Sequence, residues 1–149
     1  MMKRTFIAVA AAAALGSVAL AQTVSPAIKD RKETMKGVGQ ATAPVGKMLK
    51  GEEKFDIAKV QLALTTYQNA AKKMPGLFPP DSKTGGETTV LPAIWEKKSE
   101  FDAGFKKLAD AAATAAKAIK DEASFKTEWP KVTSNCGACH KAFRVPPKQ

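Results

Sequence analysis

The sequence predicts an all-α protein built as an antiparallel four-helix bundle. Four segments of helical length carry apolar residues at spacings of three, four and seven, which places those residues on one face of each helix. The alternation of apolar and polar residues that marks a half-buried strand is missing. Four such helices in a chain of 149 residues bury their apolar faces most readily in a single bundle, so we expect one domain.

The first 21 residues are predicted to be a secretory signal peptide rather than part of the bundle. Lys3 and Arg4 precede an apolar run from Phe6 to Leu20, and Ala19-Leu20-Ala21 has the small residues of a cleavage site. The run is short for a membrane span, which argues against an uncleaved anchor. Cleavage after Ala21 leaves residues 22–149 as an exported domain without a further apolar run of membrane length.

The first two helices are predicted over residues 25–49 and 55–74. Ser25-Pro26 is typical of a helix start, with proline in the first turn, and Gly51 follows the expected end of the first helix. The apolar stripe of the first helix also carries Arg31, which is unusual for a charged residue.

The last two helices are predicted over residues 93–120 and 122–145. They follow a loop from Pro75 to Pro92 that is rich in Pro, Gly, Thr and Asp, and a loop of this length in a small domain is usually functional or disordered. Pro130 lies inside the last helix and should kink it, unless the helix begins there.

The chain is basic, with a formal charge of +10 from 24 Lys and Arg against 14 Asp and Glu. The lysines are scattered rather than gathered into one run, and nucleic-acid-binding motifs are absent, so a solvated basic surface is the simplest interpretation. The sharper alternative is a docking surface for an acidic partner protein.

The chemistry of the chain is concentrated in Cys136-Gly137-Ala138-Cys139-His140, a C-x-x-C-H motif. Residues three apart on a helix share a face, so both thiols can reach the vinyl groups of one porphyrin edge while His140 ligates the iron. The motif therefore predicts one covalently attached c-type haem. Other uses fit less well: a zinc site needs about four ligands, a thioredoxin-like pair needs a strand-helix context, and a plain disulfide needs no histidine beside it.

With this motif near the C-terminus of a helical chain, the sequence resembles the class II c-type cytochromes, the family of cytochrome c′ and its low-spin relatives. Residues 136–144 (CGACHKAFR) match the family's C-x-x-C-H-x-x-[FY]-R ending. Arg31, followed four residues later by Met35, is similar to the family's first helix. Weaker similarities at 50–56 and 92–101 fall in the same order, and the resemblance covers essentially the whole mature chain.

The resemblance implies a left-handed bundle with the haem between the first and the fourth helices. It places Arg31, Phe143 and Arg144 around the haem, with Arg31 pairing a propionate; the alternative for Arg31 is a surface side chain whose charge reaches solvent. It also implies a periplasmic location, because bacteria attach c-type haem outside the cytoplasm. Some family members form homodimers through the first two helices and others stay monomeric, so both states remain open.

The second axial position of the iron separates two functions within this family. His140 is the only histidine, so the position is taken by a methionine or left vacant. Met35, Met48 and Met74 follow the signal peptide, and a methionine on an apolar stripe is usually core. Met35 differs because it shares the stripe of Arg31 that should face the fourth helix, so we favour it as the distal ligand.

His140/Met35 ligation implies a low-spin electron carrier, with redox proteins bearing acidic surfaces as its partners. The alternative is a high-spin, five-coordinate cytochrome c′ that binds nitric oxide or carbon monoxide. Catalysis is not predicted, because a peroxidase needs a distal acid or base and the only histidine is already used.

Overall fold

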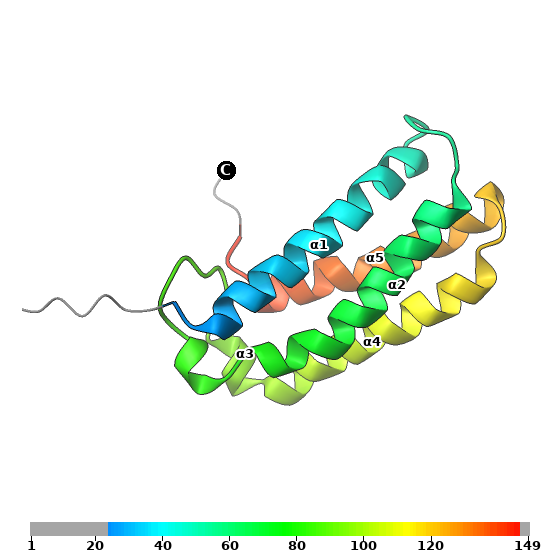
Figure 1. The fold of residues 1–149 in the computed structure, drawn as a ribbon. Helices are drawn as coiled ribbons and strands as arrows, with labels where there is room; N and C mark the ends of the chain where they lie inside the picture. Colours follow the sequence, from blue (N-terminus) through cyan, green and yellow to red (C-terminus); the bar gives the residue numbers. More distant parts are fainter. Residues whose placement is uncertain (1–23, 147–149) are drawn as a thin grey trace, which may run out of the picture.

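The computed structural model describes residues 24–146, and this part of the chain folds into four long helices that lie side by side (Figure 1). The long helices are α1 (Pro26–Leu49), α2 (Ile57–Lys73), α4 (Lys98–Ala118) and α5 (Glu122–Phe143). Between α2 and α4 lie two 3₁₀ turns, η1 (Met74–Leu77) and η2 (Pro80–Ser82), and the short helix α3 (Ala93–Glu96). The predicted four-helix bundle is confirmed, while the predicted signal peptide lies outside the described residues.

Helix α1 begins and ends where the sequence predicts. Ser25 is its N-cap residue, although the Ser25 side chain makes no capping hydrogen bond. At the other end Gly51 has a φ of 78°, and the amides of Gly51 and Glu52 donate to the carbonyl oxygens of Met48 (3.0 Å) and Lys47 (2.9 Å). This is a Schellman motif, which needs the left-handed conformation that glycine adopts without strain.

Aspartates start the second and the last long helices. The Asp56 carboxylate accepts hydrogen bonds from the amides of Ala58 (2.9 Å) and Lys59 (3.2 Å) at the start of α2. At the start of α5, Asp121 and Ser124 form a capping box. Hydrogen bonds from Ser124 lower the pKa of Asp121 below its ordinary value, so this cap is ionised at neutral pH.

The third predicted helix is two helices rather than one. Lys97 leaves the helical conformation, with φ −121° and ψ 43°, and separates α3 from α4. On the α3 side of this break, the indole N–H of Trp95 donates to the carbonyl oxygen of Phe78 (2.9 Å). A break that is accompanied by such a long-range contact leaves no signal in the apolar periodicity, which continues across it.

Helix α5 runs through Pro130 and ends at Phe143, two residues before the predicted end. Instead of continuing the helix, the Val145 amide donates to the carbonyl oxygen of Thr89 (2.8 Å). The Leu91 amide donates to the carbonyl oxygen of Phe143 (3.0 Å), and the two segments form an isolated antiparallel bridge. The loop before α3 therefore pairs with the end of the last helix.

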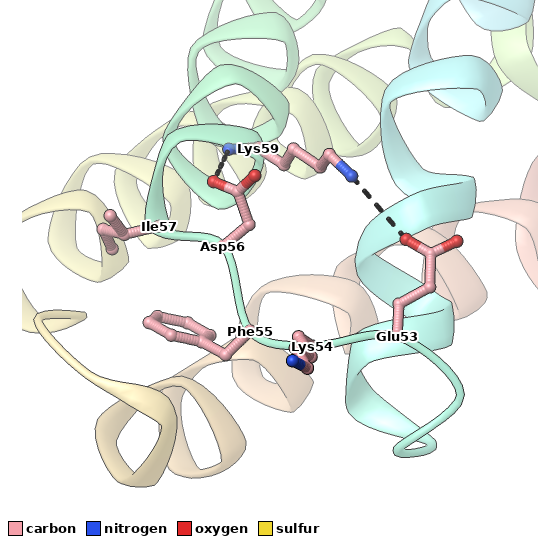
Figure 2. Close-up of a pocket in the computed structure, with 6 residues that line it drawn as sticks. All are labelled: Glu53, Lys54, Phe55, Asp56, Ile57 and Lys59. Atoms are coloured by element: carbon pink, nitrogen blue, oxygen red, sulfur yellow. Dashed lines mark hydrogen bonds and ion pairs between the residues drawn. The ribbon is translucent and has the colours of Figure 1, made fainter.

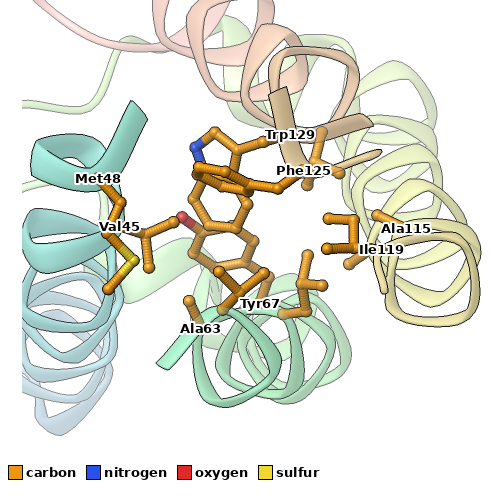
Figure 3. Packing of buried hydrophobic residues seen from close by; sticks show 12 residues of the cluster. Val45, Met48, Ala63, Tyr67, Ala115, Ile119, Phe125 and Trp129 are labelled. Carbon is orange, nitrogen blue, oxygen red and sulfur yellow. The ribbon is translucent and has the colours of Figure 1, made fainter. Parts of the chain in front are cut away.

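Two clusters of buried side chains fill the bundle. The first, at the end where α1 finishes and α5 begins, has Tyr67, Phe125 and Trp129 at its centre (Figure 3). The ring centroid of Trp129 lies 5.6 Å from that of Tyr67 and 5.8 Å from that of Phe125. The second cluster lies at the other end and consists of Ala71, Met74, Phe78, Ile94, Phe101, Phe105 and Phe143.

No helix among residues 24–146 is long and apolar enough to cross a membrane. The C-x-x-C-H motif lies in the last turns of α5, beside the second cluster, and Met35 of α1 packs against the same cluster.

Candidate haem-binding site

The two cysteines lie three residues apart in α5 and are not joined to each other. Both Cys136 and Cys139 are half-buried free thiols, and His140 beside them is exposed. Cys139 also packs against the second buried cluster. The helix thus presents two sulfur atoms and an imidazole together, which is the donor set that covalent haem attachment requires.

The partial burial of these groups and their charged neighbours determine the direction in which their pKa values shift. Burial raises the pKa of both the Cys136 and the Cys139 thiols, and the charge of Cys136 adds to this at Cys139. Although His140 is exposed overall, partial desolvation of its imidazole, assisted by the charge of Arg144, lowers its pKa and favours the neutral form that ligates iron.

A zinc site made by the protein alone finds too few ligands in the part of the chain that the structure describes. No group of three or more His, Cys, Asp or Glu side chains lies close enough there to hold a metal ion. This agrees with the count of two cysteines and one histidine in the whole sequence.

Met35 of α1 reaches the same buried cluster as Cys139 of α5. Both side chains are half-buried and pack against the cluster that contains Phe101 and Phe143. The other two methionines of residues 24–146 are core residues, since Met48 is 2% exposed in the first cluster and Met74 is 4% exposed in the second. Among the described methionines, Met35 is therefore the one whose side chain is not already enclosed by protein.

Arg31, one turn before Met35, is buried rather than at the surface. It is 4% exposed, and its guanidinium group donates to the carbonyl oxygen of Leu77, to both oxygens of Ser82 and to the hydroxyl of Thr88. The alternative of a surface arginine is therefore wrong. Every one of these acceptors is neutral, and within residues 24–146 no carboxylate forms an ion pair with Arg31.

A buried cation without an anion is costly, so an anionic group near Arg31 would stabilise it. Haem carries two propionates, so the surroundings of Arg31 fit this cofactor. The arrangement of the helices fits it as well: α1–α2, α2–α4 and α4–α5 pack closely along their lengths, whereas α1 and α5 approach at few points although they are neighbours in Figure 1.

The remaining two predicted haem neighbours lie at the end of α5. Phe143 is buried and its ring centroid is 5.3 Å from that of Phe101. Arg144 is exposed and is held by the bridge to Val90. The structure thus brings Phe143 into the cluster that Met35 and Cys139 share, and leaves Arg144 at the rim.

Tyr67 is a polar residue of the first cluster whose hydrogen-bond partner the sequence did not reveal. The Thr42 hydroxyl donates to the carbonyl oxygen of Val38 (2.6 Å), so the Tyr67 hydroxyl is left to donate to Thr42 (2.7 Å). Burial raises the pKa of Tyr67 to about 12, and the charge of Cys136 acts in the same direction. Tyr67 therefore remains protonated and links α2 to α1.

A hollow in the surface at the α1–α2 turn is separate from this site (Figure 2). It is lined by Glu53, Lys54, Phe55, Asp56, Ile57 and Lys59. Phe55 packs on Phe125 with 5.6 Å between ring centroids, and Phe125 precedes Cys136 by eleven residues, or about 16 Å along a helix. Three of the four charged side chains that line this hollow are already occupied, because Asp56 caps α2 and Glu53 pairs with Lys59 and also with Lys47.

A four-helix bundle with a C-x-x-C-H motif on its last helix defines a c-type cytochrome of class II, and comparison with known proteins agrees. The family model described as Cytochrome C′ matches residues 26–144. The chain belongs to the cytochrome c′ family, whose members bind one covalently attached c-type haem.

Relatives with two different names resemble this chain. It is 50% identical to a cytochrome c′ of Rhodopseudomonas palustris over 145 residues, which cover 97% of this chain and 98% of the relative. It is 36% identical to a cytochrome c-556 of Agrobacterium fabrum over 119 residues, which cover 79% and 80%. The solved structure of cytochrome c′ from Rhodopseudomonas palustris matches with a TM-score of 0.80 and 50% identity, over 85% of this chain and all of that one.

Proposed function

We propose that this chain is a periplasmic electron carrier in which His140 and Met35 ligate the iron of a single haem. The observation that supports this most is that Met35 and Cys139, on the two helices that approach at few points, pack against one buried cluster. When bound, the haem supplies a one-electron redox couple. Cys136 and Cys139 hold it, and a methionine ligand raises its reduction potential.

A second function is favoured by a specific observation. A relative named cytochrome c′ is 50% identical to this chain, whereas the relative named c-556 is 36% identical. The five-coordinate, gas-binding form expected of cytochrome c′ needs Met35 to pack beside the iron without ligating it. Either form uses the same cysteines and the same histidine, so the two functions differ in the behaviour of one side chain.

Replacing Met35 with leucine separates these functions. Leucine keeps the volume of methionine and removes the sulfur, so the fold should change little. We expect the oxidised wild-type protein to show a sulfur-to-iron charge-transfer band, and M35L to lose it and to bind carbon monoxide rapidly after reduction. Absorption spectra of both oxidation states, with and without carbon monoxide, measure this.

Met48→Leu is the matched control, because Met48 is enclosed in the other cluster. It should keep the wild-type spectrum. A wild-type protein that is high-spin and binds carbon monoxide freely would establish the second function instead. A band that survives in M35L would show that Met35 is not the ligand.

The surface around the end of α5 supports the expected acidic partner. Nine of the fourteen acidic residues lie in the α1–α2 turn, in α4 and around the first half of α5, where eight ion pairs form among the described residues, and the other five lie in α1, in the loop before α3 and in α3. No acidic residue follows Glu128 in the sequence. Lys141 and Arg144, beside the haem-attachment motif, are exposed and have no ion pair within residues 24–146.

Reversing the charge of Lys141 is expected to slow electron transfer to an anionic oxidant. We expect oxidation of the reduced protein by ferricyanide to slow down with added salt, and K141E to be about three- to tenfold slower than wild type at low ionic strength, because unscreened charges act over about 10 Å or more. Stopped-flow rates over a range of ionic strengths measure this.

Lys117→Glu provides the control for this charge reversal. Lys117 is an exposed residue near the end of α4, at the other end of the bundle. Its replacement by glutamate changes the net charge by the same amount as K141E. Equal slowing in K141E and K117E would show that net charge, rather than a local docking surface, governs the rate.

The homodimer expected through the first two helices stays a prediction. Leu62 on α2 is 64% exposed and Ile57 is 39% exposed, so this helix carries large apolar side chains that a partner subunit would cover. Export, with cleavage after Ala21, belongs to the same proposal because haem attachment of this type takes place outside the cytoplasm.

A further inference from the structure

The loop between η1 and α3 is bonded to both helices of the haem site. We call residues 78–91 the strap. At its first part, Ser82 is fully buried, and Ser82 accepts hydrogen bonds from Arg31 at its hydroxyl (3.1 Å) and at its carbonyl oxygen (3.0 Å). Further along, the Thr88 hydroxyl accepts a hydrogen bond from Nη2 of the same guanidinium group (2.9 Å), the nitrogen that also donates to the carbonyl oxygen of Ser82.

The other end of the strap is bonded to α5. The Leu91 amide donates to the carbonyl oxygen of Phe143 (3.0 Å), and the Val145 amide donates to the carbonyl oxygen of Thr89 (2.8 Å). Phe143 is three residues after His140, so this end of the strap is one turn from the iron ligand. The strap thus connects α1 to α5 where the helices themselves approach at few points.

The part of the strap that bonds α1 is also one helical turn from an iron ligand, because it bonds Arg31 and the proposed distal ligand is Met35. Arg31 precedes Met35 by four residues, so the two side chains lie on the same face of α1, one turn apart. The guanidinium group also lies over the ring of Phe78, with 4.9 Å from its central carbon to the ring centroid. Four hydrogen bonds and this cation–π contact leave Arg31 little freedom to move.

We propose that Ser82 and Thr88 are positioning residues that, through Arg31, fix Met35 relative to His140. Within residues 24–146 neither side chain hydrogen-bonds to Met35 or His140, and nothing in the sequence sets the two residues apart from other loop hydroxyls. The strap bonds α5 through its backbone, and it bonds α1 through these two hydroxyls and the carbonyl oxygen of Ser82, so it sets the separation of the two iron-facing helices. This inference rests on the proposed function in that Met35 lies on the distal side of the iron.

The test replaces Thr88 with valine in the haem-loaded protein. Valine has the shape of threonine without the hydroxyl, so Arg31 loses one acceptor while packing is kept. Thr88→Ser returns the hydroxyl and should rescue, and Ser82→Ala should act in the same direction as T88V. Thr66→Val is the control, since the Thr66 hydroxyl bonds only a carbonyl of its own helix (2.8 Å).

Two measurements are made on each folded variant. Hydrogen exchange at the Leu91 and Val145 amides measures how often the hydrogen bonds between the strap and the end of α5 open. We expect this exchange to be about tenfold faster in T88V than in wild type. The charge-transfer band, followed with rising temperature, measures whether the Met35 sulfur stays bound to the iron. It should be lost at a lower temperature in T88V than in wild type. T88S and T66V should match wild type in both.

Each other outcome is decisive. Unchanged exchange in T88V and S82A would show that Arg31 does not hold the strap. Faster exchange with an unchanged band would show that the strap does not position Met35. If the wild-type protein has no such band, the proposed Met35 ligation fails by itself, and carbon monoxide affinity replaces the band: a change in T88V but not in T66V supports the positioning role, and equal affinities overturn it.

Discussion

Replacing Cys136 and Cys139 together with serine is expected to abolish covalent haem attachment. The chain has no other cysteine, so no second sulfur atom can form a thioether. His140 alone would hold haem only as a dissociable ligand. The mass of the exported protein after acid denaturation should fall by that of one haem relative to wild type, in addition to the small change from the two substitutions, and haem staining on a denaturing gel should be lost.

The single variants make this prediction sharper. Cys136→Ser and Cys139→Ser each leave one sulfur, so each should retain haem through one bond, in lower yield. Haem mass on the double variant would place the attachment elsewhere and would remove the basis of the site. A wild-type protein whose mass includes no haem would contradict the proposed haem site in the same way.

Much of the fold is determined by residues that are close together in the sequence, and these features could therefore be predicted from the sequence. The four stripes, the Ser25 and Gly51 boundaries of α1 and the start of α5 at Glu122 depend on residues close in sequence. The haem-attachment residues were equally accessible, because the spacing of Cys136, Cys139 and His140 carries its own chemistry.

The errors share a different cause. The break at Lys97 and the early end of α5 are both accompanied by hydrogen bonds to the strap, at Phe78 and at Thr89, whose partners are distant in sequence. Arg31 stood out as a charge on an apolar stripe, yet its partners Ser82 and Thr88 are separated from it by 51 and 57 residues. No periodicity links such positions, so only the folded chain reveals them.

The largest loss of stability is expected for Trp129→Ala. Trp129 is 2% exposed at the centre of the first cluster, between Tyr67 and Phe125 (Figure 3). Removing its side chain should lower the free energy of unfolding by about 3–5 kcal/mol, through lost burial and the cavity left behind. This is a large part of the total of about 5–15 kcal/mol that holds a typical domain. The midpoint of urea unfolding of the haem-loaded protein measures the change.

The position of Trp129 connects this core to the haem site. Trp129 precedes Cys136 by seven residues, so both lie on one face of α5, two turns apart, and the cluster around Trp129 fixes how α5 is rotated toward α1. Trp129→Phe keeps an aromatic ring there and should lose clearly less stability than W129A. If W129A unfolds at the wild-type urea midpoint, with an unchanged slope, the first cluster does not hold α5, and the orientation of Cys136 and Cys139 must come from the strap and the haem instead.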